Sequence, residues 1–194
     1  MEKSCQWPGH DLLMKKYHDT EWGVPLHDDL KLFEFLILEG FQAGLSWSTV
    51  LKKRDAFREA FAGFDPEKIS QFTDEDVDRL MQNAGIIRNR LKIKAAINNA
   101  QQFLKVQNEL GSFDRYIWGF VGYKPVVNSF EKLSDLPAKT LLSDKISKDM
   151  SLRGFKFVGS TIIYAHMQAT GMVNDHLVHC FRYSQINAVL HTFI

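Results

Sequence analysis

Four residues near the two ends of the chain could together hold a metal ion. His176 and Cys180 are four positions apart, a separation that on a helix places two side chains on one face, one turn apart. Cys5 and His18, near the other end, would complete a set of two thiolates and two imidazoles. That set is typical of a closed, tetrahedral structural zinc site, which leaves no position for a reactive water. The alternative is that each residue is buried packing, and spacing alone leaves both open.

Two neighbouring groups bear on this site. His179 could compete as a ligand, but the one-turn separation of His176 and Cys180 is the better geometry, so we interpret His179 as an exposed neighbour. Cys5 and Cys180 are the only cysteines. We expect them to bind metal rather than form a disulfide, because cytoplasmic chains rarely keep disulfides.

A second group of residues could bind a positively charged aromatic ring. Glu39 lies in the strongly apolar segment 33–41, where an acid needs a reason, since burying an unpaired carboxylate is costly. Tyr17, Trp22 and Trp47 are close to it in the sequence, and aromatic faces attract cations by about 0.5–2 kcal/mol per contact. The alternatives are that Glu39 reaches a backbone N–H at a helix end and that each aromatic ring belongs to the core.

The charges are segregated along the chain although the formal net charge is only +1. Residues 64–79 are strongly acidic, and residues 52–54 form a small basic cluster. A balanced total argues against binding nucleic acid by bulk charge, but a local basic face could still contact phosphates. Two ordinary solvated helix faces are the alternative. The longest basic stretch, 86–105, contains no acid and carries Arg88, Arg90, Lys92, Lys94 and Lys105.

The apolar residues recur at helical spacing, and no segment alternates as a strand would. We therefore expect an all-α fold without strands and a surface loop between Pro125 and Pro137. We expect a single domain over residues 1–194, with a middle helical lobe at about 45–125 and a second lobe built from both termini. The expected helices are 28–43, Ser46 or Ser48 to about Ala62, a short one from Asp65-Pro66, Thr73 to about Asn83, 89–108, 113–121, 143–152 and 158–170.

The composition is that of a globular protein, with 45% hydrophobic and 24% charged residues. No apolar run is long enough to span a bilayer, and the first residues lack the apolar core of a secretory signal. We expect a cytoplasmic protein that does not bind membranes.

At these motifs the sequence closely resembles the 3-methyladenine DNA glycosylase I family of the helix-hairpin-helix superfamily. The resemblance covers nearly the whole chain to about Cys180, and several long motifs occur in the right order. The matching segments are Cys5-Gln6-Trp7, Tyr17-His18-Asp19, Glu21-Trp22-Gly23-Val24-Pro25, Leu38-Glu39-Gly40, Gln42-Ala43-Gly44-Leu45-Ser46-Trp47, Ala84-Gly85-Ile86-Ile87-Arg88, Arg153-Gly154-Phe155-Lys156-Phe157-Val158-Gly159 and Val173-Asn174-Asp175-His176.

The resemblance implies roles for the residues already singled out. It implies one structural zinc ion held by Cys5, His18, His176 and Cys180. It also implies a base pocket, with Glu39 as the catalytic residue among the aromatic residues Trp7, Tyr17, Trp22 and Trp47.

The resemblance places the family's hairpin near Leu80–Lys94, where only Gly85 is present of the usual glycine pair. We therefore expect DNA phosphates to be contacted by basic side chains. Leu45 is the candidate wedge that enters the base stack, with a plain core leucine as the alternative. The phosphate-contacting candidates are Arg88, Arg90, Lys92 and Lys156.

The implied activity is hydrolysis of the N-glycosidic bond of 3-methyladenine in alkylated double-stranded DNA, as a step of base excision repair. A monomer that releases free 3-methyladenine is expected, with 3-methylguanine left open as a second substrate. No lysine is placed for Schiff-base chemistry, so we expect a monofunctional enzyme. The family lacks a catalytic aspartate; the nearest candidates here are Asp114 and Asp175, and Asp175 is a candidate partner behind the zinc ligands. The alternatives are a zinc-stabilised nucleic-acid binding module and a metal hydrolase.

Overall fold

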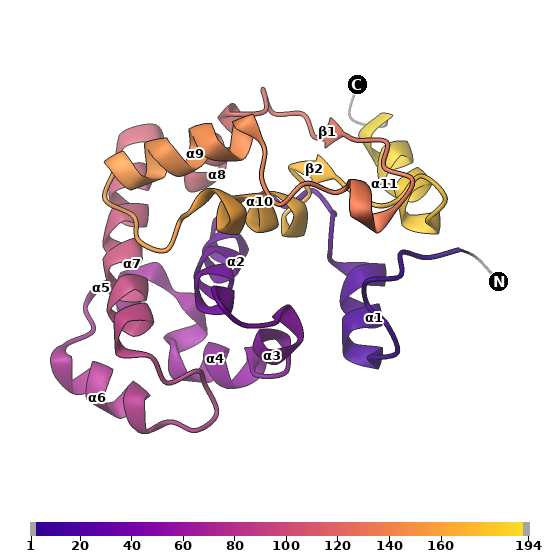
Figure 1. The fold of residues 1–194 in the computed structure, drawn as a ribbon. Coiled ribbons are helices and arrows are strands. Elements are labelled where there is room, and N and C mark those ends of the chain that lie inside the picture. Colours follow the sequence, from indigo (N-terminus) through magenta and orange to yellow (C-terminus); the bar gives the residue numbers. More distant parts are fainter. Residues whose placement is uncertain (1–2, 192–194) are drawn as a thin grey trace.

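The computed structural model describes residues 3–191 and consists mainly of helices, which confirms the all-α class (Figure 1). The expected helices other than the one from Ser46 or Ser48 are present, with both ends of the five longest within two residues of their expected positions. None of the helices described is long and apolar enough to cross a bilayer. The helices are α1 (Leu12–Thr20), α2 (Asp29–Gln42), α3 (Trp47–Leu51), α4 (Arg54–Ala60), η1 (Ala62–Phe64), α5 (Pro66–Ser70), α6 (Asp74–Gln82), α7 (Arg90–Leu110), α8 (Phe113–Gly119), η2 (Leu133–Asp135), α9 (Leu141–Leu152), α10 (Ser160–Ala169) and α11 (Phe181–His191).

One expected helix is divided into pieces. The segment from Ser46 to Ala62 forms α3 and α4, with a break at Lys52 and Lys53, and η1 follows at once. Gly63 has a φ of 70°, and both residues beside it also have positive φ, so the backbone cannot continue as an α-helix there.

The expectation of no strands is wrong in one detail. β1 (Val126–Val127) and β2 (Val173–Asn174) form a short parallel pair. The Val126 N–H donates to the Met172 carbonyl at 2.9 Å, and the Asn128 N–H donates to the Asn174 carbonyl at 3.2 Å. Strands of only two residues leave no periodic signal in the sequence, because an alternating strand pattern needs at least four residues.

Helix α2 is the centre of the core. It begins at the cap Asp28, whose carboxylate accepts from the Lys31 N–H, and every residue from Leu32 to Phe41 is buried. It packs against α7, α10, α3 and α8. A helix enclosed on most of its surface is expected to be apolar, so its two buried acids, Glu34 and Glu39, stand out; Glu34 pairs with Arg54 and Arg58.

The two ends of the chain meet on one side of the molecule (Figure 1). The Phe181 N–H at the start of α11 donates to the Lys3 carbonyl at 2.9 Å. The segment after Cys180, for which no structure is predicted from the sequence, forms α11. This meeting brings α1 and the segment before α11 together, and both carry candidate site residues.

Candidate active site

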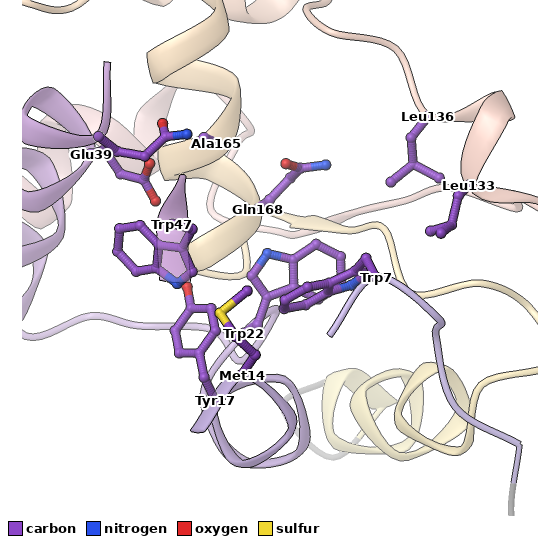
Figure 2. Close-up of a pocket in the computed structure, with 11 residues that line it drawn as sticks. Trp7, Met14, Tyr17, Trp22, Glu39, Trp47, Leu133, Leu136, Ala165 and Gln168 are labelled. Atoms are coloured by element: carbon purple, nitrogen blue, oxygen red, sulfur yellow. The ribbon is translucent and has the colours of Figure 1, made fainter. Parts of the chain in front are cut away.

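A cavity of about 380 Å³ opens between α1, α2, the start of α3 and α10, with η2 at its edge (Figure 2). The five residues that the resemblance assigned to the base pocket all line it. The lining residues are Trp7, Met14, Tyr17, Trp22, Glu39, Gln42, Trp47, Leu133, Leu136, Ala165 and Gln168.

Aromatic rings form much of the wall. The ring centroids of Tyr17 and Trp47 lie 5.4 Å apart, and those of Trp7 and Trp22 lie 5.1 Å apart with their planes at 65°. Phe35 stacks behind Trp47 at 6.4 Å, which fixes the face that Trp47 turns to the cavity. Such a wall can hold a flat ring, and it favours a ring with positive charge.

Glu39 reaches the cavity from the buried helix α2 and is only 4% exposed. Among the described residues its carboxyl group has no hydrogen-bond partner, so the alternative of a backbone N–H partner does not hold in residues 3–191. Burial raises the pKa of Glu39 to about 8. The group is therefore mostly protonated at neutral pH when only protein surrounds it, whereas the sequence led us to expect a carboxylate.

Tyr17 lies beside this acid at the cavity wall. Burial, together with the nearby Glu39, raises the pKa of the Tyr17 phenol well above its usual value. The phenol therefore stays neutral and keeps its proton for donation.

Several lining residues escaped the sequence analysis. Ala165 and Gln168 are three positions apart on α10, and Leu133 and Leu136 have the same spacing at η2. Helical spacing could have paired each couple, but nothing in the sequence indicates which face of α10 meets a cavity. Gln168 is the most polar of these residues.

Cys5, His18, His176 and Cys180 converge at a second site, with one potential ligand atom from each lying within 4.8 Å of the others. All four side chains are buried. His176 and Cys180 do not lie on a helix, contrary to the expectation. They lie on a turn closed by the Cys180 N–H, which donates to the Leu177 carbonyl at 2.7 Å. This cluster could hold one metal ion.

The imidazole rings of the cluster are oriented for metal binding. His18 Nδ1 lies 2.7 Å from the Asp19 carboxylate, and His176 Nε2 lies 3.0 Å from the Trp22 carbonyl. If each of these nitrogens carries the ring proton and donates it, the opposite nitrogen presents its lone pair to the centre. Hydrogen bonding from Cys5, and from both histidines, lowers the pKa of the Cys180 thiol, which favours the thiolate that a metal requires. His179 is exposed outside the cluster, as expected.

The cluster and the cavity share a wall. The ring centroids of Trp22 and His176 lie 4.7 Å apart, and those of Trp7 and His18 lie 5.4 Å apart. The residues that join the chain ends therefore also support two aromatic rings of the cavity.

Asp175 does not hydrogen bond with the cluster ligands, so its expected place behind them is wrong. Its carboxylate accepts from Asn128, Tyr164 and Gln168 instead. Asp114 is also away from the cavity and is hydrogen bonded to His27 at 2.7 Å. No aspartate lines the cavity among the residues the structure describes.

Two of the four basic residues predicted to contact DNA, Arg90 and Lys92, are engaged within the protein, as is the neighbouring Lys94. Arg90 pairs with Asp78 at 2.5 Å, and Lys94 pairs with Asp74 at 2.9 Å, so the acidic helix α6 neutralises the start of α7. Lys92 is buried, and its ammonium donates to the Phe41 and Ala43 carbonyls at 2.8 and 2.6 Å. This position favours a cap on the C-terminus of α2 over a phosphate contact.

The basic cluster at residues 52–54 also forms ion pairs and hydrogen bonds within the protein. Lys52 pairs with Asp11 at 2.9 Å, Lys53 donates to backbone carbonyls, and Arg54 is buried against Glu34 and Glu21. The segregation of charge in the sequence therefore reflects pairing between neighbouring elements more than a free basic face.

Three of the predicted DNA-contacting residues are exposed and have no ion-pair partner among the described residues. Arg88 and Lys156 have exposed side chains, and no ion pair within residues 3–191 involves either one. Leu45 follows α2 at Gly44, whose φ is 78°, and it is 42% exposed, so the alternative of a core leucine does not hold.

The turn between α9 and α10 has the glycine pair that the segment 80–94 lacks. Gly154 has a φ of 92°, and Gly159 precedes α10, whose first N–H groups have no side-chain cap. The Asn99 side chain holds the backbone of Lys156 on both sides, at 2.7 and 2.8 Å. Free N–H groups at a helix N-terminus beside an exposed lysine suit a phosphate.

Comparisons with a family model and with individual proteins point to the same enzyme family. The sequence model of the methyladenine glycosylase family matches residues 7–183. DNA-3-methyladenine glycosylase 1 of Escherichia coli (strain K12) is 51% identical over 179 residues, which cover 92% of this chain and 96% of that relative.

Two solved structures are similar over the same length. A crystal structure of 3-methyladenine DNA glycosylase I has a TM-score of 0.90 and 50% identity, over 92% of this chain and 98% of the other. The structure that describes 3-methyladenine recognition by the Staphylococcus aureus enzyme has a TM-score of 0.89 and 40% identity, over 92% of this chain and 95% of the other.

The raised pKa of Glu39 predicts how a Glu39→Gln variant changes stability with pH. A carboxyl whose pKa rises from 4.5 to about 8 on folding leaves stability intact below pH 4.5 and costs stability progressively as pH rises to 8. The neutral amide escapes this cost. Denaturant titrations should show Glu39→Gln more stable than the parent by about 4 kcal/mol at pH 8, and nearly equal to it at pH 4.5. A difference that does not depend on pH would contradict the buried, proton-bearing acid.

Proposed function

This chain belongs to the methyladenine glycosylase family, and on that premise we propose that it hydrolyses the N-glycosidic bond of 3-methyladenine in alkylated double-stranded DNA. The observation that carries the proposal is the aromatic cavity with a buried acid, Glu39, in its wall. Binding of an ordinary duplex would need no such cavity. The activity is a step of base excision repair, and its product is the free base.

The chemistry that the cavity must supply is modest. A base in a duplex must first leave the stack to be cut out. The methylated ring carries a positive charge in DNA, and it leaves as a neutral base when the bonding electron pair returns to its ring nitrogen. Water adds to the sugar carbon and loses a proton. The bond is therefore weak before the enzyme acts, and selecting the cationic base is the main task.

Three side chains have roles in this selection. Tyr17 and Trp47 can lie against the ring and attract its charge. A cationic ring beside Glu39 favours the carboxylate, because an opposite charge lowers the pKa that burial has raised. Glu39 then accepts a hydrogen bond from the base and neutralises its charge. Lysine is absent from the described lining of the cavity, which supports a monofunctional hydrolase without Schiff-base chemistry.

We propose that the metal of the second site is zinc in a structural role. Bonds of about 2.3 Å to sulfur and about 2.0 Å to nitrogen at tetrahedral angles place sulfur and nitrogen about 3.5 Å apart, and two nitrogens about 3.3 Å apart. Three of the four sulfur–nitrogen distances are 3.6, 3.7 and 3.8 Å, and the nitrogen–nitrogen distance is 3.1 Å. Four protein ligands leave no open position, which argues against a metal hydrolase. When bound, the ion ties the chain ends together.

For DNA we propose fewer contacting residues than the sequence predicts. The turn between α9 and α10, with Lys156, would hold a phosphate, and Arg88 would contribute charge from the start of α7. Leu45, exposed at the end of the helix that carries Glu39, would enter the gap left by the extruded base. Arg90 and Lys92 are less suited, because their charges already have partners.

The activity is tested by release of free base from methylated duplex DNA. We expect the parent protein to release 3-methyladenine without cutting the strand. Glu39→Gln should lower kcat/KM by about 10–100-fold, the scale of one hydrogen bond to a charged group. Its affinity for undamaged duplex should be unchanged, since that contact is with phosphates. A folded parent protein that releases no 3-methyladenine would refute the proposal.

The zinc assignment predicts one zinc ion per chain in the reduced, freshly purified protein. Cys180→Ser should lower the melting temperature far more than it lowers base release at low temperature, because the ion acts on the fold. Metal analysis and thermal melting on the same samples provide the measurement. Loss of activity at unchanged stability would make the metal catalytic instead.

The smaller set of phosphate contacts predicts which lysine contributes to DNA binding. Lys156→Ala and Arg88→Ala should each weaken binding to any duplex sequence and reduce the slope of log affinity against log salt by about one. Lys94→Ala is the matched control, since Lys94 is already paired with Asp74. The assignment fails if Lys94→Ala changes the slope and Lys156→Ala does not.

A further inference from the structure

Gln168 is the polar residue that α10 contributes to the cavity wall (Figure 2). Its amide nitrogen donates to Asp175 Oδ2 at 2.7 Å. Asp175 is 1% exposed and accepts two more hydrogen bonds, from the Tyr164 hydroxyl at 2.5 Å and from the Asn128 amide at 2.6 Å. This buried carboxylate is fully engaged without touching the cavity.

The contact with Asp175 fixes which end of the Gln168 amide faces the cavity. A carboxylate only accepts hydrogen bonds, so the amide nitrogen must point to Asp175 and the oxygen must point away. In Figure 2 the oxygen lies on the side of the amide that faces Ala165 and Glu39. Among the described residues this oxygen has no hydrogen-bond partner.

We propose that the Gln168 amide oxygen accepts a hydrogen bond from the exocyclic amino group of the alkylated adenine, and that Asp175 is the positioning residue that holds the amide in this orientation. The inference rests on the proposed function and names what selects an adenine over a 6-oxo purine in the same cavity. Adenines carry an amino donor where guanine and hypoxanthine carry a carbonyl acceptor. An acceptor held in one orientation hydrogen bonds with the amino group of an adenine and repels the carbonyl oxygen of a 6-oxo purine.

Because Asp175 holds the Gln168 amide in one orientation, the cavity should discriminate between the two kinds of purine more strongly than it would with a freely rotating glutamine. An unanchored glutamine amide can rotate and present its nitrogen to a carbonyl, so it would bind either purine. A site whose polar group cannot adapt leaves an acceptor facing an acceptor, and such mismatches discriminate strongly. We expect the parent protein to prefer the amino base by at least about tenfold, the effect of one neutral hydrogen bond won or lost.

The experiment compares free 3-methyladenine with free 3-methylhypoxanthine, its 6-oxo counterpart, in titrations followed by tryptophan fluorescence. Asp175→Asn keeps the shape but lets the neighbouring amides take either orientation. It should gain affinity for the 6-oxo base by about tenfold while losing little for 3-methyladenine. A merely loosened cavity would lose affinity for both bases. Zinc content and melting temperature are measured alongside, because His176 is the next residue.

Three further variants sharpen the test. Asn128→Asp with Asp175→Asn returns a carboxylate to the network. The new acid accepts the amide nitrogen of the residue at 175 and turns its oxygen to Gln168, so the parent preference should return. Tyr164→Phe, the matched control, removes one donor and leaves Asp175 as an acceptor, so it should keep the preference. Gln168→Met should bind 3-methyladenine about tenfold more weakly. It should gain far less for the 6-oxo base than Asp175→Asn does, because it has no amide nitrogen to offer.

The outcomes separate the inference from the proposed function. If the parent releases 3-methyladenine from DNA but Asp175→Asn leaves the preference between the two bases unchanged, the inference is overturned and the function stands. An equal gain for the 6-oxo base in Gln168→Met and Asp175→Asn also overturns it, because the amide would then be irrelevant. If the parent neither binds nor releases 3-methyladenine, both fail together.

Discussion

The convergence of Cys5, His18, His176 and Cys180 is the constraint on which the aromatic wall depends. His176 Nε2 lies 3.0 Å from the Trp22 carbonyl oxygen, and the His176 ring packs against the Trp22 ring. At Gly23 an added Cβ would lie 2.9 Å from the same imidazole nitrogen, so the backbone passes there in direct contact with the cluster. A bound ion at this cluster would therefore fix both the chain ends and the position of two tryptophans, and it would affect the pocket through its walls.

The second constraint is the burial of α2, which places an acid in the cavity wall with little exposure to water. Lys92 caps the carbonyls at the end of this helix, and Phe35, four residues before Glu39, backs Trp47. The helix thus delivers the acid, supports one ring of the wall and ends at Gln42, three residues before the exposed Leu45. Proteins tolerate an unpaired buried carboxyl when it serves a function, and its cost to stability must be met by the surrounding apolar contacts.

Much of this arrangement could be predicted from the sequence, and the failures share a cause. The helices of the core are predicted by apolar spacing and capping residues, the four cluster residues by their types and spacing, and the five pocket residues by the long motifs that carry them. The basic residues were misjudged because charge along a sequence does not show which helices will lie side by side. Packing of α6 near α7 pairs Lys94 with Asp74, and the fold draws Lys92 inward to α2. Gln168 was missed for the same reason, since only the position of α10 shows which of its faces lines the cavity.

Desolvation, more than distance, sets the selectivity that we propose for Glu39. With a pKa of about 8, the acid needs only about 1.4 kcal/mol to ionise at pH 7. A neutral adenine gives no charge to offset even this cost, and it meets a protonated acid. A cationic base in the same cavity offsets it with a close opposite charge in surroundings of low dielectric constant, where such an attraction is strong. A more exposed carboxylate would already be ionised, but water would screen its attraction for the cationic base, so it would distinguish the two bases less strongly. The depth at which α2 holds Glu39 is therefore itself a determinant of which base the cavity accepts.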